Sequence, residues 1–268
     1  MTEPASLTPF SQLLAAIQAE GDGFGVDLPG DWLQGRTAYG GLTAALCVAA
    51  GQRRLEAPAP LRSAQFAFIG PSSGRLAITP TVLRQGKSSV YMGVDLVGDA
   101  GIAARALLCF GATRPSRIDY QSLPAPDVAD WNSCPAYFKG GQGPSFAVHF
   151  DSRLAAGAWP LTPGAEPDMS LWLKHREAGA GATMVGLVAL ADALPPASII
   201  QFPERAPFST MTWSIDMLTD APASVSDWWL IRSTAERTGQ GYSAQAMTLW
   251  NDRREAVMVA RQQVALFV

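Results

Sequence analysis

The stretch YGGLTAALCVAAGQRRL, from Tyr39 to Leu55, carries small or apolar residues on every side of the helix that its pattern predicts. Such a helix is stable in water only when other elements cover it almost completely. Segments of strand length, each bounded by Gly, Pro, Asp or Ser, follow it at 61–74, 75–88, 89–101 and 102–115. We therefore expect a strongly curved antiparallel sheet wrapped around a central helix.

The same order of elements occurs a second time. A second apolar helix is predicted from Thr183 to Leu194, and Asp192 is its one polar side chain after the first residue. In the closest correspondence between the halves, LRQGKSSVYMGVDL against ERTGQGYSAQAMTL, Arg84 and Arg237 occupy equivalent places. Strand-like segments precede this helix at 145–159 and 168–179 and follow it at 208–224, 227–241, 242–254 and 255–268.

Two such units side by side predict one continuous sheet, which is the tandem or double hotdog architecture of the α+β class. In this interpretation residues 1–114 form the first hotdog and residues 145–268 form the second. Pro, Gly, Asp and Ser dominate residues 115–144, as is typical of a linker.

Charge and hydropathy exclude several classes of partner. The net charge is −3 without a Lys or Arg cluster, so we expect no nucleic acid partner. No apolar run approaches the roughly 20 residues of a membrane span. Glu3 lies where a signal peptide carries positive charge, which favours a cytoplasmic protein. Charged residues are only 16% of the chain, so we expect a large core and a homodimer or larger assembly.

Histidine and cysteine are too scarce for several kinds of site. His149 and His175 lie in separate strand-like segments, and the three cysteines lack CxxC spacing. These counts argue against zinc, haem and histidine-based catalysis, so we expect no metal and no cofactor. Residues 70–74 read Gly-Pro-Ser-Ser-Gly, but a strand-like run follows them where a nucleophile elbow requires a helix.

Six stretches, spread from Trp32 to the end of the chain, resemble the acyl-CoA thioesterase II family. They are WLQGRTAYGGLTAALCVAA, FAFIGPSSGRLAITPTVLRQGKSS, LWLKHRE, VGLVALADALPP, FSTMTWSIDML and VMVARQQVALF. The resemblance implies a double hotdog that hydrolyses acyl-CoA thioesters to free carboxylic acids and CoA.

The resemblance also implies a catalytic group made of an aspartate, a threonine and a glutamine from the second hotdog. Asp192 in LADALPP and Thr210 in FSTMTWSI match the first two. For the third, the alignment favours Gln263, and a slip of one residue would select Gln262, because adjacent strand residues face opposite sides. The first half has Ala50 and Gly51 where an acid would lie, so one active site per chain is expected.

These residue types suit thioester hydrolysis. A carboxylate acts as general base on water or attacks the carbonyl directly, and burial at a helix C-terminus raises its pKa towards neutrality. We assign Asp192 as base, with Thr210 and Gln263 orienting the water. Gly40 and Gly41 open the first helix and are candidate backbone donors to the carbonyl oxygen.

The sequence leaves open two alternatives to a thioesterase. A non-catalytic acyl-CoA or lipid-binding protein could keep the fold, and an acyl-CoA hydratase or dehydratase would want a histidine beside an acid. Lys174 or Arg176 could meet CoA phosphates, although a solvated face explains them better. Candidates for the pocket lining are Trp32, Phe66, Phe68 and Trp213.

Overall fold

Twelve strands form one antiparallel sheet in the computed structural model, which describes residues 7–138 and 143–268. Six strands come from the first half of the chain: β1 (Gln18–Glu20), β2 (Gly23–Asp27), β5 (Leu61–Phe68), β6 (Arg75–Gln85), β7 (Ser89–Gly98) and β8 (Gly101–Gly111). Six come from the second half: β9 (Phe150–Gly157), β10 (Asp168–His175), β11 (Phe208–Met217), β12 (Trp229–Gly239), β13 (Tyr242–Trp250) and β14 (Ala256–Leu266).

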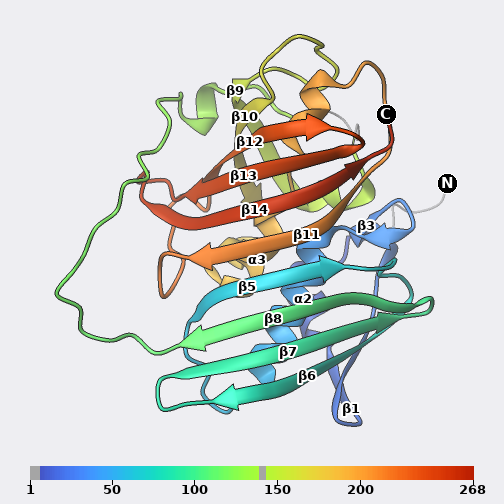
Figure 1. Cartoon of the computed structure of the whole chain (residues 1–268), viewed down its shortest axis with the longest axis vertical. Helices are drawn as coiled ribbons and strands as arrows, with labels where there is room; N and C mark the ends of the chain where they lie inside the picture. Colours follow the sequence, from blue (N-terminus) through green and yellow to red (C-terminus); the bar gives the residue numbers. More distant parts are fainter. Residues whose placement is uncertain (1–6, 139–142) are drawn as a thin grey trace.

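The strand order repeats about the middle of the sheet. The first half runs β1-β2-β6-β7-β8-β5 and the second runs β11-β14-β13-β12-β10-β9, so β5 and β11 join the halves as antiparallel neighbours (Figure 1). Ala64 pairs with Ile215 at this seam. The predicted α+β tandem hotdog is therefore confirmed.

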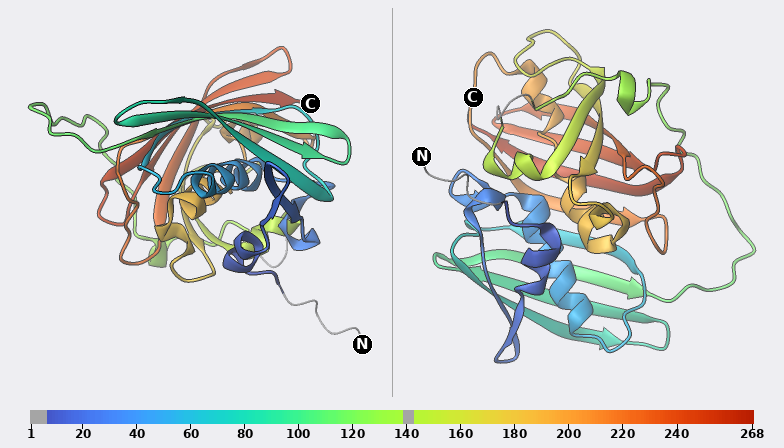
Figure 2. Two further views of the ribbon diagram at one scale, coloured as in Figure 1. Left: turned by 90° about the horizontal axis from the view of Figure 1, so that it is seen from below. Right: turned by 180° about the vertical axis from the view of Figure 1, so that it is seen from behind.

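The two central helices lie against the concave side of the sheet, which curves over them (Figure 2). α2 (Gly40–Arg53) matches the prediction closely. α3 (Met184–Ala191) is shorter than predicted. Pro195 disfavours a helical backbone at the residue before it, Leu194, so the helix cannot continue to that position. The Thr183 side chain caps the start of α3 by accepting a hydrogen bond from the Gly186 N–H.

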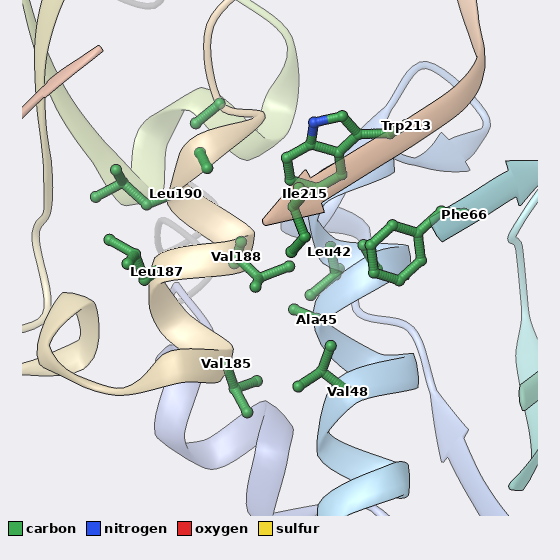
Figure 3. Close-up of a cluster of buried hydrophobic side chains, with 14 of the residues drawn as sticks. Leu42, Ala45, Val48, Phe66, Val185, Leu187, Val188, Leu190, Trp213 and Ile215 are labelled. Atoms are coloured by element: carbon green, nitrogen blue, oxygen red, sulfur yellow. The ribbon is translucent and has the colours of Figure 1, made fainter. Parts of the chain in front are cut away.

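The core lies where the two helices meet each other and the sheet (Figure 3). Leu42 and Val48 of α2 face Val188 of α3, while Phe66 and Trp213 close this cluster from the two seam strands. All five side chains are buried. Fully burying a side chain of this size stabilises a fold by about 1.5–3 kcal/mol, so this contact holds the two halves together.

A β-bulge marks the same place in each half. The β6–β7 register shifts between Val82 and Arg84, and the β12–β13 register shifts between Ala235 and Arg237. A bulge inserts one residue and increases the local twist, which helps a sheet to curve around a helix. The equivalence of Arg84 and Arg237, predicted from the sequence, is thus confirmed at the level of register.

The segment expected as a linker, 115–144, is only partly a free connection. Residues 112–130 contain no helix or strand. Several groups nevertheless attach this segment to the second half: Trp250 donates its indole N–H to the Leu123 carbonyl, and Trp172 donates its indole N–H to the Ala129 carbonyl. Residues 139–142 of the expected linker lie outside the described residues.

The remaining described elements are short. They are the helix α1 (Phe10–Ala15), the hairpin of β3 (Leu33–Gln34) and β4 (Thr37–Ala38), and the 3-10 turns η1 (Gly30–Trp32), η2 (Trp131–Ser133), η3 (Ser145–His149), η4 (Ala180–Ala182) and η5 (Ala197–Gln201). Within the described part of the chain, no helix combines the length and apolarity needed to cross a membrane.

Candidate active site

A cavity of about 1180 Å³ opens between the two halves, beside the ends of the central helices. Three of the sequence-predicted residues line it: Asp192 after α3, Thr210 on β11 and Gly40 at the start of α2. Gln262 of β14 lines it as well. Residues from four separate elements of the chain therefore meet at the cavity.

Asp192 directly follows the last residue of α3, as its C-cap. Its side chain lines the cavity, and Gln262 Nε2 donates a hydrogen bond to its Oδ1 over 2.5 Å. The backbone N–H of Gly41 also donates to this carboxyl group. Burial raises the pKa of Asp192 to about 7, although both hydrogen bonds act to lower it. A carboxyl group with this pKa exchanges a proton near neutral pH, which suits a general base.

Glycine at positions 40 and 41 allows the start of α2 to approach the end of α3. A Cβ on Gly41 would lie 2.6 Å from the Ala189 carbonyl oxygen and 2.9 Å from Asp192 Cβ. A Cβ on Gly40 would lie 2.7 Å from Asp192 Oδ2. Tyr39 fixes the same contact, because its hydroxyl donates to the Ala189 carbonyl over 3.1 Å. The two glycines are therefore needed for packing as well as for donating hydrogen bonds.

The structure places Gln262, the alternative to the expected Gln263, beside Asp192. On β14, Gln262 lies opposite Trp213 and is buried, whereas Gln263 lies opposite the exposed Thr212. Gln263 does not line the cavity; it lines a second hollow of about 920 Å³ on the outer side of the sheet, which Gln262 also borders. Because the side-chain period of a strand is two, the adjacent Gln263 lies on the face of the strand that points away from Asp192.

A β-bulge directs Thr210 into the cavity. The β11–β14 register shifts between Thr210 and Thr212, so that Met211 is the extra residue of the bulge. Thr210 pairs with the buried Val264 and lines the cavity, whereas Thr212 pairs with Gln263 and lines the outer hollow. In a regular strand, residues 210 and 212 would face the same side. The bulge therefore separates them.

The first half has no room for a second acid at the equivalent place. Ala50 and Gly51 are buried within α2. A Cβ on Gly51 would already lie 2.8 Å from a methyl group of Leu108 and 3.2 Å from Met92 Sδ. This part of the first hotdog is packed core, which agrees with the expectation of one site per chain.

Aromatic and proline side chains form a large part of the cavity wall, and few of them were predicted from the sequence. Of the four predicted lining residues, Phe68 lines the cavity, whereas Trp32 does not, and Phe66 and Trp213 belong to the core. The prediction was therefore wrong for Trp32, Phe66 and Trp213. Large aromatic residues occur in cores as well as in pockets, so residue type alone does not distinguish the two. The aromatic lining residues are Phe68, Tyr137, Phe138, Phe146, Trp159, Phe202 and Phe208.

Neither histidine is among the residues that line the cavity. His175 is buried, and its Nε2 lies 2.8 Å from the Gly186 carbonyl oxygen, while burial lowers the pKa of His175 to about 4. His149 stacks on Trp32 with ring centroids 3.8 Å apart. Residues 70–74 are followed by strand β6, as predicted, so they lack the helix of a nucleophile elbow.

The fold and the site together define a class: a double hotdog protein with a partly buried carboxylate at the contact between its helices. Comparison with known families agrees. The family model for the N-terminal domain of acyl-CoA thioesterases matches residues 28–111, and the model for their C-terminal domain matches residues 121–266. The chain belongs to the acyl-CoA thioesterase family and is a thioester hydrolase.

Solved structures show the same fold over nearly the whole chain. A hot dog fold protein from Alicyclobacillus acidocaldarius has 18% identity and a TM-score of 0.86, covering 98% of this chain and 99% of its own. A putative thioesterase II from Thermobifida fusca YX has 18% identity and a TM-score of 0.81, covering 98% of each chain.

An acyl-CoA thioesterase II from Mycobacterium marinum has 15% identity and a TM-score of 0.74, covering 95% of this chain and 96% of its own. A search of curated proteins gives no match.

Proposed function

We propose that this chain hydrolyses acyl-CoA thioesters to free carboxylic acids and CoA, using a water molecule activated by Asp192, Thr210 and Gln262. The observation that carries the proposal is the carboxyl group of Asp192, which lines the cavity, has a pKa of about 7 and accepts a hydrogen bond from Gln262. At neutral pH such a group is ionised in a large fraction of molecules and accepts a proton readily.

In the proposed reaction, the Asp192 carboxylate takes a proton from water while the resulting hydroxide attacks the thioester carbonyl carbon. The tetrahedral intermediate then collapses, the carbon–sulfur bond breaks, and the proton passes from Asp192 to the leaving CoA sulfur. Gln262 donates its amide N–H to Asp192, which leaves its amide oxygen to accept from the water. Thr210 supplies a hydroxyl on the adjacent strand to hold the water in line.

We assign the backbone N–H of Gly40 to the developing negative charge on the carbonyl oxygen. Gly40 begins α2 and lines the cavity, so its N–H has no partner within the helix. The N–H of Gly41, expected to share this role, donates to Asp192 instead. In this proposal the Gly40 N–H binds the substrate carbonyl oxygen, and the Gly41 N–H binds the base.

General-base catalysis fits the site better than direct attack by the carboxylate. Gln262 and Gly41 both hold the Asp192 carboxyl group with hydrogen bonds. An attacking carboxylate must leave such partners to reach the carbonyl carbon, whereas a base keeps them throughout the reaction. A hydratase or dehydratase reaction has less support, because neither His149 nor His175 lines the cavity.

The test is release of CoA thiol from a panel of acyl-CoAs of different chain length, with Asp192→Asn compared with the wild type. Asp216→Asn is the matched control, because Asp216 is exposed on β11. We expect loss of activity only in Asp192→Asn. Full activity of that variant would refute the role of the base, and no release from any acyl-CoA would favour a binding protein. Assembly as a dimer or larger stays a prediction, checked by the mass in solution.

A further inference from the structure

Arg205 is the one cationic side chain among the described residues that line the cavity. It lies in the loop between η5 and β11, five positions before Thr210. The other lining residues near it are apolar: Phe202, Ala206 and Phe208. Among the described lining residues, Arg205 therefore supplies the one positive charge that a ligand in the cavity would meet.

The loop that carries Arg205 is held firmly in place. Phe202 is buried in a small cluster with Val264 and Leu266 of β14, and Phe208 packs against the same cluster. The N–H of Phe267 donates to the Pro207 carbonyl over 3.1 Å. Because both ends of the loop are anchored on the strand that also carries Gln262, Arg205 keeps a defined position relative to the site.

The guanidinium group of Arg205 is available to a ligand. No ion pair or hydrogen bond joins it to another side chain in residues 7–138 and 143–268, and the residue is exposed. The two residues considered for CoA phosphates from the sequence already have partners. Lys174 donates to the Ser226 carbonyl and Arg176 pairs with Asp151, and neither lines the cavity.

The chemistry of the substrate supplies a partner for this charge. The proposed substrate is a thioester whose pantetheine arm ends in phosphate groups, whereas the protein itself has a net charge of −3. The overall field therefore opposes binding, and a local cation at the cavity is needed to offset it. A guanidinium group is well suited to this task, since its planar N–H donors match two phosphate oxygens at once.

We propose that Arg205 binds a phosphate group of the CoA part of the substrate and thereby selects phosphate-bearing thioesters over thioesters of the same acyl group without phosphate. This inference rests on the proposed function, because it takes the thioester as the ligand. It assigns a binding role to a residue outside the Asp192, Thr210 and Gln262 group.

The kinetic test compares three thioesters of one acyl group: with CoA, with pantetheine 4′-phosphate and with N-acetylcysteamine, which carries no phosphate. For Arg205→Gln we expect KM for acyl-CoA to rise about tenfold, the loss of one charge-assisted interaction. Its kcat, and its kcat/KM for the N-acetylcysteamine thioester, stay unchanged. Arg205→Lys keeps most of the affinity, and Arg84→Gln, at an exposed position on β6, is the control.

The middle substrate identifies the phosphate that is bound. If acyl-pantetheine 4′-phosphate shows the same rise in KM as acyl-CoA, Arg205 contacts the phosphate on the pantetheine arm. If only acyl-CoA shows it, Arg205 contacts the nucleotide end. Equal losses on all three thioesters would mean that Arg205 supports the fold alone and would overturn the inference.

Calorimetric titration with free CoA separates this inference from the proposed function. Weaker CoA binding by Arg205→Gln supports the inference, whether or not the wild type hydrolyses acyl-CoAs. Unchanged CoA binding and unchanged KM overturn it, even when the wild type is an active thioesterase. If the wild type neither binds CoA nor hydrolyses its thioesters, the inference and the proposed function both fail.

Discussion

The side-chain amide of Gln262 donates a hydrogen bond to Asp192 across 70 positions of sequence, from the last strand to the end of α3. This contact connects the sheet to the central helix at the place where the cavity meets the helix. A buried carboxylate without partners would be driven to protonate. The amide lowers the pKa of Asp192 from the value that burial alone would give, and so keeps the group able to act near neutral pH.

The two adjacent glutamines of β14 form a matched pair for mutation. We expect Gln262→Ala to lower kcat about 100-fold, as for the removal of one positioned hydrogen-bond group from an active site. Gln263→Ala is expected to change kcat by less than about twofold, because that side chain lies on the outer face. The measurement is CoA release under saturating acyl-CoA. A larger loss from Gln263→Ala would reverse the assignment.

Two threonines of β11 provide a second matched pair. Thr210→Val is expected to lower kcat about tenfold through loss of one hydroxyl hydrogen bond, while Thr212→Val acts as the neutral control. CoA release under saturating acyl-CoA is compared for the two variants. A larger loss from Thr212→Val than from Thr210→Val would contradict the assignment of Thr210 to the cavity.

The rate should depend on the ionisation of Asp192. Since only the carboxylate form accepts a proton, kcat/KM is expected to rise with pH through about 7 and to level off above it. In Gln262→Ala the hydrogen bond that lowers this pKa is absent, so the inflection should move to higher pH. The profile is measured with one acyl-CoA between pH 5 and 9. A flat profile over that range would argue against Asp192 as the base.

The same raised pKa predicts a stability effect. In the unfolded chain the pKa of Asp192 is close to 3.8, and in the folded chain it is about 7, so the folded state loses stability as pH rises between these values. At about 1.4 kcal/mol per pKa unit, Asp192→Asn should raise the free energy of unfolding by up to about 4 kcal/mol at pH 8. The gain should shrink towards pH 4. Urea unfolding at both pH values measures it, and a pH-independent gain would contradict this origin.

Gly41→Ala tests the close contact between the helices. The added Cβ would meet the Ala189 carbonyl and Asp192, so we expect a destabilisation of about 1–3 kcal/mol and a lower kcat. Gly30→Ala is the control, because a Cβ there would have no heavy atom within 4 Å. Thermal unfolding and CoA release are compared for both variants. Equal unfolding temperatures and equal kcat values for the two variants would show that neither stability nor activity depends on this close contact.

Patterns of local hydrophobicity were sufficient for the architecture. The helix of residues 40–53, its shorter counterpart after Thr183 and the eight strands that follow them were predicted within a few residues. The sequence also identified Asp192 as a candidate site residue, because an acidic residue in an apolar helix is unusual in any tertiary structure. The segment 115–144 was less well predicted, since the sequence shows its polar composition but not that Trp172 and Trp250 bind its backbone.

What the sequence determined by itself is the repeated helix-and-strand order and the presence of one acid in the second helix, because both follow from residues within a few positions of each other. The tertiary structure alone decided that Gln262 faces Asp192, that a bulge at Met211 turns Thr210 inwards, and that Arg205 lines the same cavity. The physical reason is strand pairing: a shift of one residue exchanges the two faces of a strand, and its register is set by partners far away in the sequence.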